Sequence, residues 1–174
     1  MLSTFPQTHK PPLFERMVMD FSAGLVAEPA QQRGGVGVDW RAWLAGVPGW
    51  GNAVCAPRHV GLWDWFAGLE REIKPRARIE IWGRGGAKSS TAELGTTYVG
   101  LRKTRRFVLY ISDTQAQSDK HVQAIAALLE LVGMRRAVNR YNHSKGWTQR
   151  ILRAANDFNV VSLGFDASMA GIKL

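Results

Sequence analysis

The chain has 174 residues, of which 45% are apolar and 21% are charged, and this composition is typical of a soluble globular protein with one domain. It contains no apolar run of membrane-spanning length and no secretory signal, and its single cysteine, Cys55, excludes an internal disulfide framework and a cysteine-rich metal site. We therefore expect a protein of a reducing cytoplasm. The net charge of +9 favours a polyanionic partner such as DNA, RNA or a nucleotide.

The first 50 residues are expected to form an irregular and partly helical segment. Residues 1–37 are rich in Pro, Gly and Gln, with one short helix predicted near Phe14–Leu25. Asp39 can cap a helix whose apolar residues follow helical spacing: Trp40, Trp43, Leu44 and Val47. Beyond the breaks between Pro48 and Pro57, a second amphipathic helix is predicted to end before Pro75, with one face made of Leu62, Phe66, Leu69 and Ile73.

From Ile79 onward, strands and helices are predicted to alternate. The predicted elements are a strand at 78–82, a loop at 83–88, a helix at 89–101, a strand at 106–112, a helix at 117–131, a basic loop at 133–146, a helix at 147–156 and a strand at 159–165. Such alternation predicts an α/β fold, with a mostly parallel sheet flanked by helices.

The loop between the first predicted strand and helix carries the strongest chemical signal. Glycines allow backbone N–H groups to approach phosphate oxygens, the helix N-terminus favours an anion, and Lys88 with the hydroxyl of Ser89 can hold a phosphate and Mg²⁺. The match to the pattern G-x-x-x-x-G-K-[ST] is imperfect, because Trp82 and Ala87 stand at its two glycine positions. A simple glycine-rich turn between a strand and a helix is the alternative.

The stretch from Arg84 to Thr91, RGGAKSST, resembles the variant phosphate loop of the large subunit of tailed-phage terminases, the ATPase that drives DNA into procapsids. That family's loop commonly carries an arginine four residues before the lysine, and it tolerates an alanine just before the lysine. The weaker resemblances follow in the family's order and together extend over roughly residues 50–174: Ala56–His59, Phe107–Gln117, Asn156–Val161 and Ala170–Leu174.

The resemblance implies that residues 51–174 form the N-terminal part of a P-loop NTPase domain of RecA-like fold, which binds ATP and Mg²⁺. It assigns contacts with the nucleotide to Gly83, Arg84, Gly85, Gly86, Ala87, Lys88, Ser89, Ser90, Arg58 and His59. Within that set, Arg84 and Lys88 are the expected catalytic residues, Ser89 is the expected metal ligand, and Arg58 and His59 are expected on the adenine side. Thr114 and Gln115 are expected to couple the nucleotide state to DNA movement.

The family's paired acids, which hold the metal and polarise the attacking water, have no counterpart in the chain. Asp113 and Asp166 each follow an apolar strand as single acids, and we interpret them as turn residues. The nuclease domain is absent as well, so we expect an N-terminal portion of the ATPase that is poorly active or inactive alone. The partners implied by the resemblance are double-stranded DNA, the portal protein, the small terminase subunit and further copies of the same chain.

Several plainer interpretations stand beside these. Arg84 can pair with Glu80 or Glu93, and Asp113 or Thr114 can simply cap a helix. The basic cluster at 102–106 suits a helix C-terminus, the tryptophans suit a core, and His9, His121 and His143 show no metal spacing. Two other functions remain open, namely a different P-loop phosphoryl-transfer enzyme such as a nucleoside kinase and a non-catalytic basic DNA-binding module.

Overall fold

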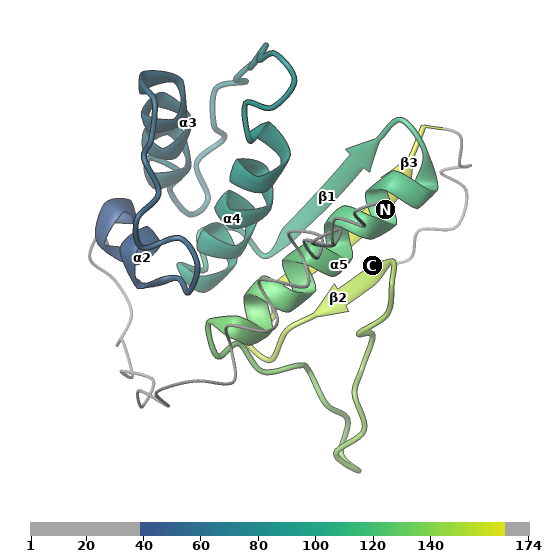
Figure 1. Ribbon diagram of the computed structural model, residues 1–174. Helices are drawn as coiled ribbons and strands as arrows, with labels where there is room; N and C mark the ends of the chain where they lie inside the picture. Colours follow the sequence, from purple (N-terminus) through teal and green to yellow (C-terminus); the bar gives the residue numbers. More distant parts are fainter. Residues whose placement is uncertain (1–38, 166–174) are drawn as a thin grey trace, which may run out of the picture. The chain divides into compact units, whose positions relative to one another are not determined.

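The computed structural model describes residues 39–165, which all fall within the same unit of the chain. The helix predicted near Phe14–Leu25, the acid Asp166 and the stretch Ala170–Leu174 lie outside the described residues. The elements, labelled in Figure 1, are α2 (Trp40–Gly46), α3 (Pro57–Ala67), α4 (Lys88–Leu101), β1 (Phe107–Ser112), α5 (Gln115–Leu131), β2 (Ile151–Arg153) and β3 (Asn159–Gly164). No helix among residues 39–165 is both long and apolar enough to cross a lipid bilayer.

The sheet has three described strands in the order β1-β3-β2. Strands β1 and β3 are parallel, in a register that runs from Phe107 opposite Asn159 to Ser112 opposite Gly164, and α5 makes the crossover between them. Strand β2 is antiparallel to β3 and forms a hairpin with it. The α/β class with a sheet flanked by helices is therefore confirmed, but the described sheet is mixed and not mostly parallel.

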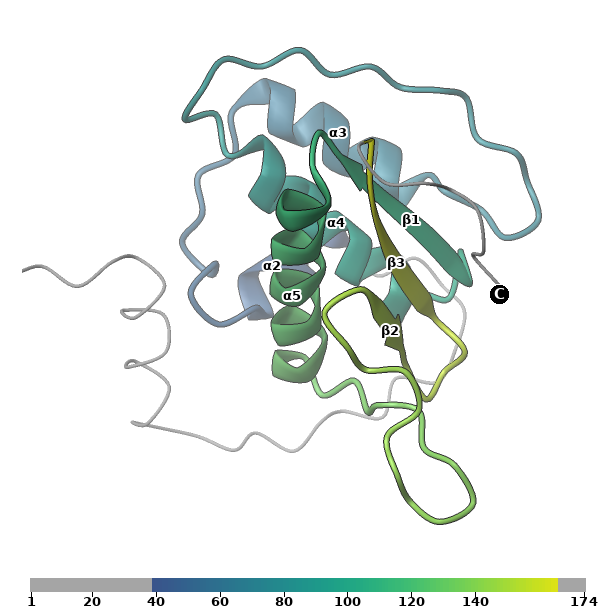
Figure 2. The ribbon, with the colours of Figure 1, turned by 90° about the vertical axis from the view of Figure 1, so that its right-hand side faces the viewer.

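Helix α5 packs on one face of this sheet, as the views in Figures 1 and 2 show. Its residues Val122, Ile125 and Leu129 are fully buried, and they pack with Leu152 of β2 and Val160 of β3 in one apolar cluster. Their helical spacing puts them on a single face, which is the pattern that the sequence predicted for this segment. The same packing fixes the N-terminus of α5 next to the carboxyl ends of β1 and β3.

A second apolar cluster joins α2, α3 and α4. The rings of Trp40 and Trp63 stack with their centroids 5.5 Å apart, and Trp43 and Tyr98 pack around them. Trp40 and Trp63 are almost fully buried, so the prediction that tryptophans at helical spacing belong to a core is confirmed for these two. Helix α2 thus belongs to the same core as the helix that follows the glycine loop.

The strand predicted at 78–82 is wrong. This segment is extended, but it pairs with no described strand, and the side chains of Ile79 and Ile81 are 85% and 91% exposed. Upstream, it is held to α3 by the indole of Trp65, which donates to the carbonyl oxygen of Arg76 at 3.2 Å. The apolar, β-branched side chains indicated the extended backbone correctly, but they carried no information on whether a neighbouring strand was present.

The helix predicted at 147–156 is also wrong, because this segment contains β2 and the turn of the β2–β3 hairpin. Asp157 has a left-handed φ of 68°, and the side-chain oxygen of Asn156 accepts a hydrogen bond from the amide of Phe158. Short polar residues of this kind favour a tight turn over a helix end.

Helix α3 ends at Ala67, eight residues earlier than the predicted limit at Pro75, and Gly68 follows as its C-cap. Ile73, which the helical spacing placed on the buried face, is 57% exposed. The chain after α3 is fixed instead by Arg105, whose guanidinium donates to the carbonyl oxygens of Glu70 at 2.5 Å and Ile73 at 2.8 Å. Arg102 likewise donates to the carbonyl of Ala67 at 2.6 Å. Arg102 therefore binds the C-terminus of α3, and Arg105 binds the loop after it, whereas the sequence analysis expected this cluster to serve the C-terminus of the helix that it directly follows.

Candidate nucleotide site

The glycine loop, residues 83–87, turns the chain directly into the first residue of α4. The amide of Gly86 donates to the carbonyl of Gly83 at 3.4 Å, and Gly85 has a positive φ of 76° that glycine adopts without strain. Ala87 is left-handed as well, with a φ of 55° immediately before Lys88. The standard pattern has a glycine at this position, and the conformation explains why: an L-residue there costs roughly 1–2 kcal/mol.

The first turn of α4 presents Lys88 and Ser89 to solvent, with Ser90 half-buried beside them. The hydroxyl of Thr91 is turned inward and donates to the carbonyl of Ala87 at 2.9 Å, so this buried hydroxyl is satisfied within the helix. No hydrogen bond or ion pair joins the amine of Lys88 to any residue within 39–165. A lysine and a serine hydroxyl are thus accessible at the N-terminus of a 14-residue helix, where the backbone amides and the helix dipole favour an anion.

Arg84 does not form either of the ion pairs that the sequence left open. Glu80 accepts hydrogen bonds from Arg78 at 2.5 Å and from the indole of Trp82 at 2.7 Å, and these contacts lower its pKa. Glu93 is instead paired with a histidine of α5. Arg84 is exposed and has no acidic partner among the described residues, which leaves its charge available at the mouth of the loop.

Two residues from the start of α3 are brought to the glycine loop. The imidazole Nε2 of His59 lies 2.9 Å from the carbonyl oxygen of Gly86, and its ring meets the ring of Trp82 edge-on at 4.9 Å. The guanidinium of Arg58 lies over the same indole at 5.8 Å from its centroid. The structure thus places the two residues expected on the adenine side next to the loop, and Trp82 joins them. His59 and Ala87 also line a small hollow beside Thr91 and Leu94.

Thr114 and Gln115 lie at the carboxyl end of β1, where α5 begins. Thr114 is the N-cap of α5 and accepts a hydrogen bond from the amide of Gln117 at 3.3 Å. Gln115 binds β3, since its amide oxygen accepts from the backbone of Gly164 at 3.1 Å and its Nε2 donates to the hydroxyl of Ser162 at 2.9 Å. Gln115 is therefore bonded to β3, whereas the hydrogen bond of Thr114 lies within the first turn of α5.

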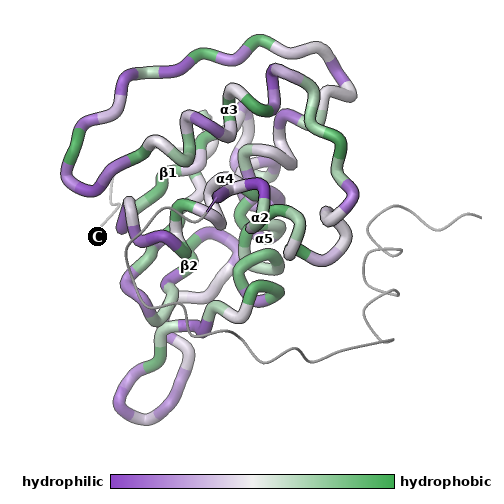
Figure 3. Tube along the Cα trace, turned by 90° about the vertical axis from the view of Figure 1, so that its left-hand side faces the viewer, coloured by the Kyte–Doolittle hydropathy of each residue, from purple (hydrophilic) through white to green (hydrophobic). Residues whose placement is uncertain are grey.

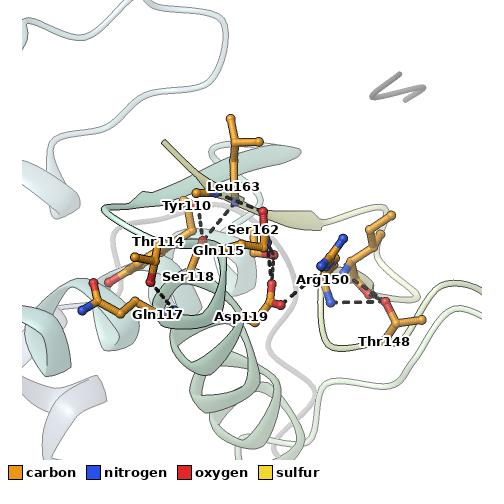
Figure 4. Close-up of polar contacts among 12 residues, drawn as sticks. Tyr110, Thr114, Gln115, Gln117, Ser118, Asp119, Thr148, Arg150, Ser162 and Leu163 are labelled. Carbon is orange, nitrogen blue, oxygen red and sulfur yellow. Dashed lines mark hydrogen bonds and ion pairs between the residues drawn. The ribbon is translucent and has the colours of Figure 1, made fainter. Parts of the chain in front are cut away.

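Gln115 belongs to a polar network that the sequence analysis missed, drawn in Figure 4. Asp119 accepts hydrogen bonds from Ser162 at 2.5 Å and Gln115 at 2.6 Å, and Arg150 lies 3.5 Å from its other oxygen. Burial alone would raise the pKa of Asp119, but the hydrogen bonds from Ser162 and Gln115, together with Arg150, outweigh it and lower the pKa. One residue earlier, the fully buried hydroxyl of Ser118 donates to β1 and accepts from β3.

A signal for this network was present in the sequence. Ser118 precedes Val122 by one helical turn and therefore lies on the buried face of α5, and Ser162 interrupts an otherwise apolar strand. A polar side chain in a buried position requires a hydrogen-bond partner. Here those partners connect β1, β3 and α5 at the end of the sheet where α/β folds bind ligands.

A second missed pair joins α4 to α5. Glu93 lies 2.6 Å from the Nδ1 of His121, and the ring of Tyr110 packs on that imidazole with the centroids 5.1 Å apart. Burial raises the pKa of Glu93, with His121 acting in the opposite direction. Burial, and then the charge of Glu93, raises the pKa of Tyr110 to about 12. The carboxylate of α4 is therefore paired with a histidine of α5.

Among residues 39–165 no three His, Cys, Asp or Glu side chains gather as a metal site would require. Asp113 is an exposed turn residue between β1 and Thr114, as the sequence analysis expected.

The chain was compared with protein-family models, with curated proteins and with solved structures. None of them matched it.

Proposed function

We propose that the chain is the ATP-binding part of a phage DNA-packaging motor of the terminase large-subunit type. The observation that carries this proposal is the glycine loop itself, which has two left-handed residues, Gly85 and Ala87, and turns directly into a helix that begins at Lys88. An accessible lysine, a following hydroxyl and free helix amides form the part of a P-loop that wraps the phosphates. The neighbouring Arg58 and His59 add a contact surface of the kind the resemblance requires.

Each residue then has a definite role. The amides of residues 85–89 hold the β-phosphate, the amine of Lys88 bridges the β- and γ-oxygens, and the hydroxyl of Ser89 is the Mg²⁺ ligand. Arg84 reaches the γ-phosphate from the mouth of the loop. We further propose that the sheet belongs to a domain of RecA-like fold and that double-stranded DNA is the partner that is translocated. In the motor, the chain would assemble with the portal protein, the small terminase subunit and other copies of itself.

A motor of this type positions its attacking water and its metal with paired acids at a strand end, whereas the described strand ends are followed by one acid, Asp113 after β1. We therefore expect weak nucleotide binding and little or no hydrolysis by the isolated chain, because acid and metal positioning account for a large share of the rate. Rapid turnover by the 174-residue chain would contradict the expectation that it has no counterpart of the paired acids.

Replacing Lys88 tests whether the glycine loop binds the phosphates of a nucleotide. Lys88→Ala should abolish measurable ATP binding in isothermal titration calorimetry, because it removes the cation between the β- and γ-phosphates. Lys120→Ala, an exposed lysine on α5, is the matched control and should keep the wild-type affinity. Equal affinity for ATP in the wild-type chain and in Lys88→Ala would remove the nucleotide part of the proposal.

A nucleoside kinase is the second enzyme class that the loop allows. Such an enzyme needs an acidic substrate site after the loop, whereas residues 131–156 contain arginines and no acid. Incubation with Mg²⁺-ATP and a mixture of nucleosides and nucleoside monophosphates should therefore yield no phosphorylated product.

A further inference from the structure

The segment between α5 and the β2–β3 hairpin has an unusual distribution of charge. Residues 131–156 contain six Lys or Arg and no Asp or Glu, and the acids that bound this stretch are Glu130 and Asp157. The cations are Arg135, Arg136, Arg140, Lys145, Arg150 and Arg153. The chain's excess of positive charge is therefore concentrated here, in residues far from the glycine loop in the sequence.

This stretch forms a two-stranded ribbon, which we call the ribbon arm (residues 137–145). Its backbone bonds run from the amide of Asn139 to the carbonyl of His143 at 2.9 Å, and from the amide of Lys145 to the carbonyl of Ala137 at 2.7 Å. In Figures 1 and 2 the arm extends away from α5 and the sheet, and in Figure 3 its colouring is largely hydrophilic. Figure 1 shows it at the opposite end of the described fold from the glycine loop.

The tip of the ribbon arm is held in a defined shape. The side-chain oxygen of Asn139 accepts hydrogen bonds from the amides of Tyr141 at 2.9 Å and His143 at 3.0 Å, and Asn142 completes the turn with a left-handed φ of 62°. Tyr141 is 64% exposed, and the guanidinium of Arg140 lies over its ring at 4.6 Å. An ordered tip presents its groups without the full entropic cost of ordering a free loop on binding.

The acids near the ribbon arm form ion pairs with arginines outside residues 137–145, so the tip of the arm keeps its positive charge. The two described pairs are Arg136 with Glu130 and Arg150 with Asp119. Arg140 and Lys145 are exposed, and neither has an acidic partner among residues 39–165. Positive charge that is ordered, exposed and without local neutralisation is the electrostatic footprint of a polyphosphate partner.

We propose that the ribbon arm is the surface of this chain that contacts duplex DNA, through the phosphate backbone and without sequence preference. The major groove of B-DNA admits a two-stranded ribbon, and arginine, lysine and tyrosine side chains are suited to its phosphates. The deep and narrow major groove of A-form RNA does not admit such a ribbon, so the geometry favours DNA. This inference deepens the proposed function, on which its biological meaning rests, by naming the face that meets the duplex.

The test uses the full chain and a labelled DNA duplex of mixed sequence in fluorescence anisotropy over a series of salt concentrations. The double variant Arg140→Gln/Lys145→Gln should weaken binding by roughly tenfold or more at about 0.1 M salt, and should reduce the slope of log K against log salt by about two. The control Lys74→Gln/Lys120→Gln removes the same charge from exposed positions outside the arm, and it should keep both the slope and most of the affinity.

The outcomes separate this inference from the proposed function. An unchanged slope in the arm variant, equal losses in both variants, or tighter binding to duplex RNA than to DNA would overturn the assignment of the arm. ATP affinity should be unaffected by the arm substitutions, because the glycine loop lies at the other end of the fold. If Lys88→Ala loses ATP binding and keeps normal DNA binding, the result supports both the proposed motor function and a DNA site separate from the glycine loop. If the wild-type chain binds DNA through the ribbon arm but does not bind ATP, only the proposed motor function is overturned.

Discussion

His59 donates the hydrogen of its Nε2 to the carbonyl oxygen of Gly86, and this bond joins the start of α3 to the glycine loop. The tautomer follows from the other ring nitrogen, because Nδ1 lies 3.0 Å from the amide nitrogen of Ala56, which can only donate. Nδ1 must therefore accept, and Nε2 must carry the hydrogen that reaches Gly86 at 2.9 Å. One side chain thus caps a helix and fixes the conformation of the loop.

Two substitutions at this position separate its two roles. Asn at position 59 can still accept from the amide of Ala56 but is too short to reach Gly86, so His59→Asn should loosen the loop and leave α3 capped. We expect about a fivefold loss of ATP affinity, equivalent to one hydrogen bond of about 1 kcal/mol, with little change in urea denaturation. His59→Ala loses the cap as well and should also be less stable by about 1 kcal/mol. Unchanged ATP affinity in both variants would show that the loop does not depend on this bond.

The contact between α3 and α4 leads to a second prediction. A Cβ built on Gly95 would lie 2.2 Å from the ring of Phe66, a distance that no rotation of the new methyl group can relieve. Alanine is a better helix former than glycine by about 1 kcal/mol, but overpacking a core typically costs about 1–3 kcal/mol. Gly95→Ala should therefore destabilise the fold in urea unfolding.

The control for this prediction is Gly46→Ala at the end of α2, where no atom lies within 4 Å of the new methyl group. It should be neutral or stabilising by about 0.5–1 kcal/mol, because only the helix preference acts. A stabilised Gly95→Ala variant would mean that α3 and α4 can separate without loss, contrary to the packing described above.

The parts of the fold that were predictable from sequence are those set by local chemistry. The capping residue Asp39, the periodic apolar residues of α5 and the continuous apolar run of β1 each specify a local structure by themselves. The start of α4 at Lys88 was predictable in the same way, within one residue. The loop residues and their neighbours were found because glycine, lysine and hydroxyl residues at that spacing have a physical purpose.

The failures concern pairing, which depends on partners distant in the sequence. Residues 78–82 have a strand-like composition but pair with no strand of the described part of the chain, whereas Ile151–Arg153 became a strand because β3 offered an antiparallel edge. The Asp119 network was missed for the same reason, since its acceptors and donors come together only when α5 packs on β3. Periodicity specifies which face of an element is buried, but not which element will cover it.

The Asp119 network gives a prediction on pH. The pKa of Asp119 is lowered from its ordinary value of 3.8, so the folded chain favours the ionised carboxylate. Its contribution to stability is therefore fully present above that value and is lost as the pH falls through the lower pKa of the folded state. Asp119→Asn cannot ionise, and we expect it to be less stable than the wild-type chain by about 1–2 kcal/mol near pH 7, because two hydrogen bonds to a charged group become bonds to a neutral one.

The measurement is urea unfolding of both chains at a series of pH values down to about pH 3, where the gap between them should shrink as the wild-type carboxylate takes up its proton. Asp113→Asn, at an exposed turn with no side-chain hydrogen bond among the described residues, should change stability by less than about 0.5 kcal/mol throughout. If the gap for Asp119→Asn is absent at neutral pH, the network does not stabilise the ionised form. If the gap stays constant into acid, the lost stability comes from packing and not from charge.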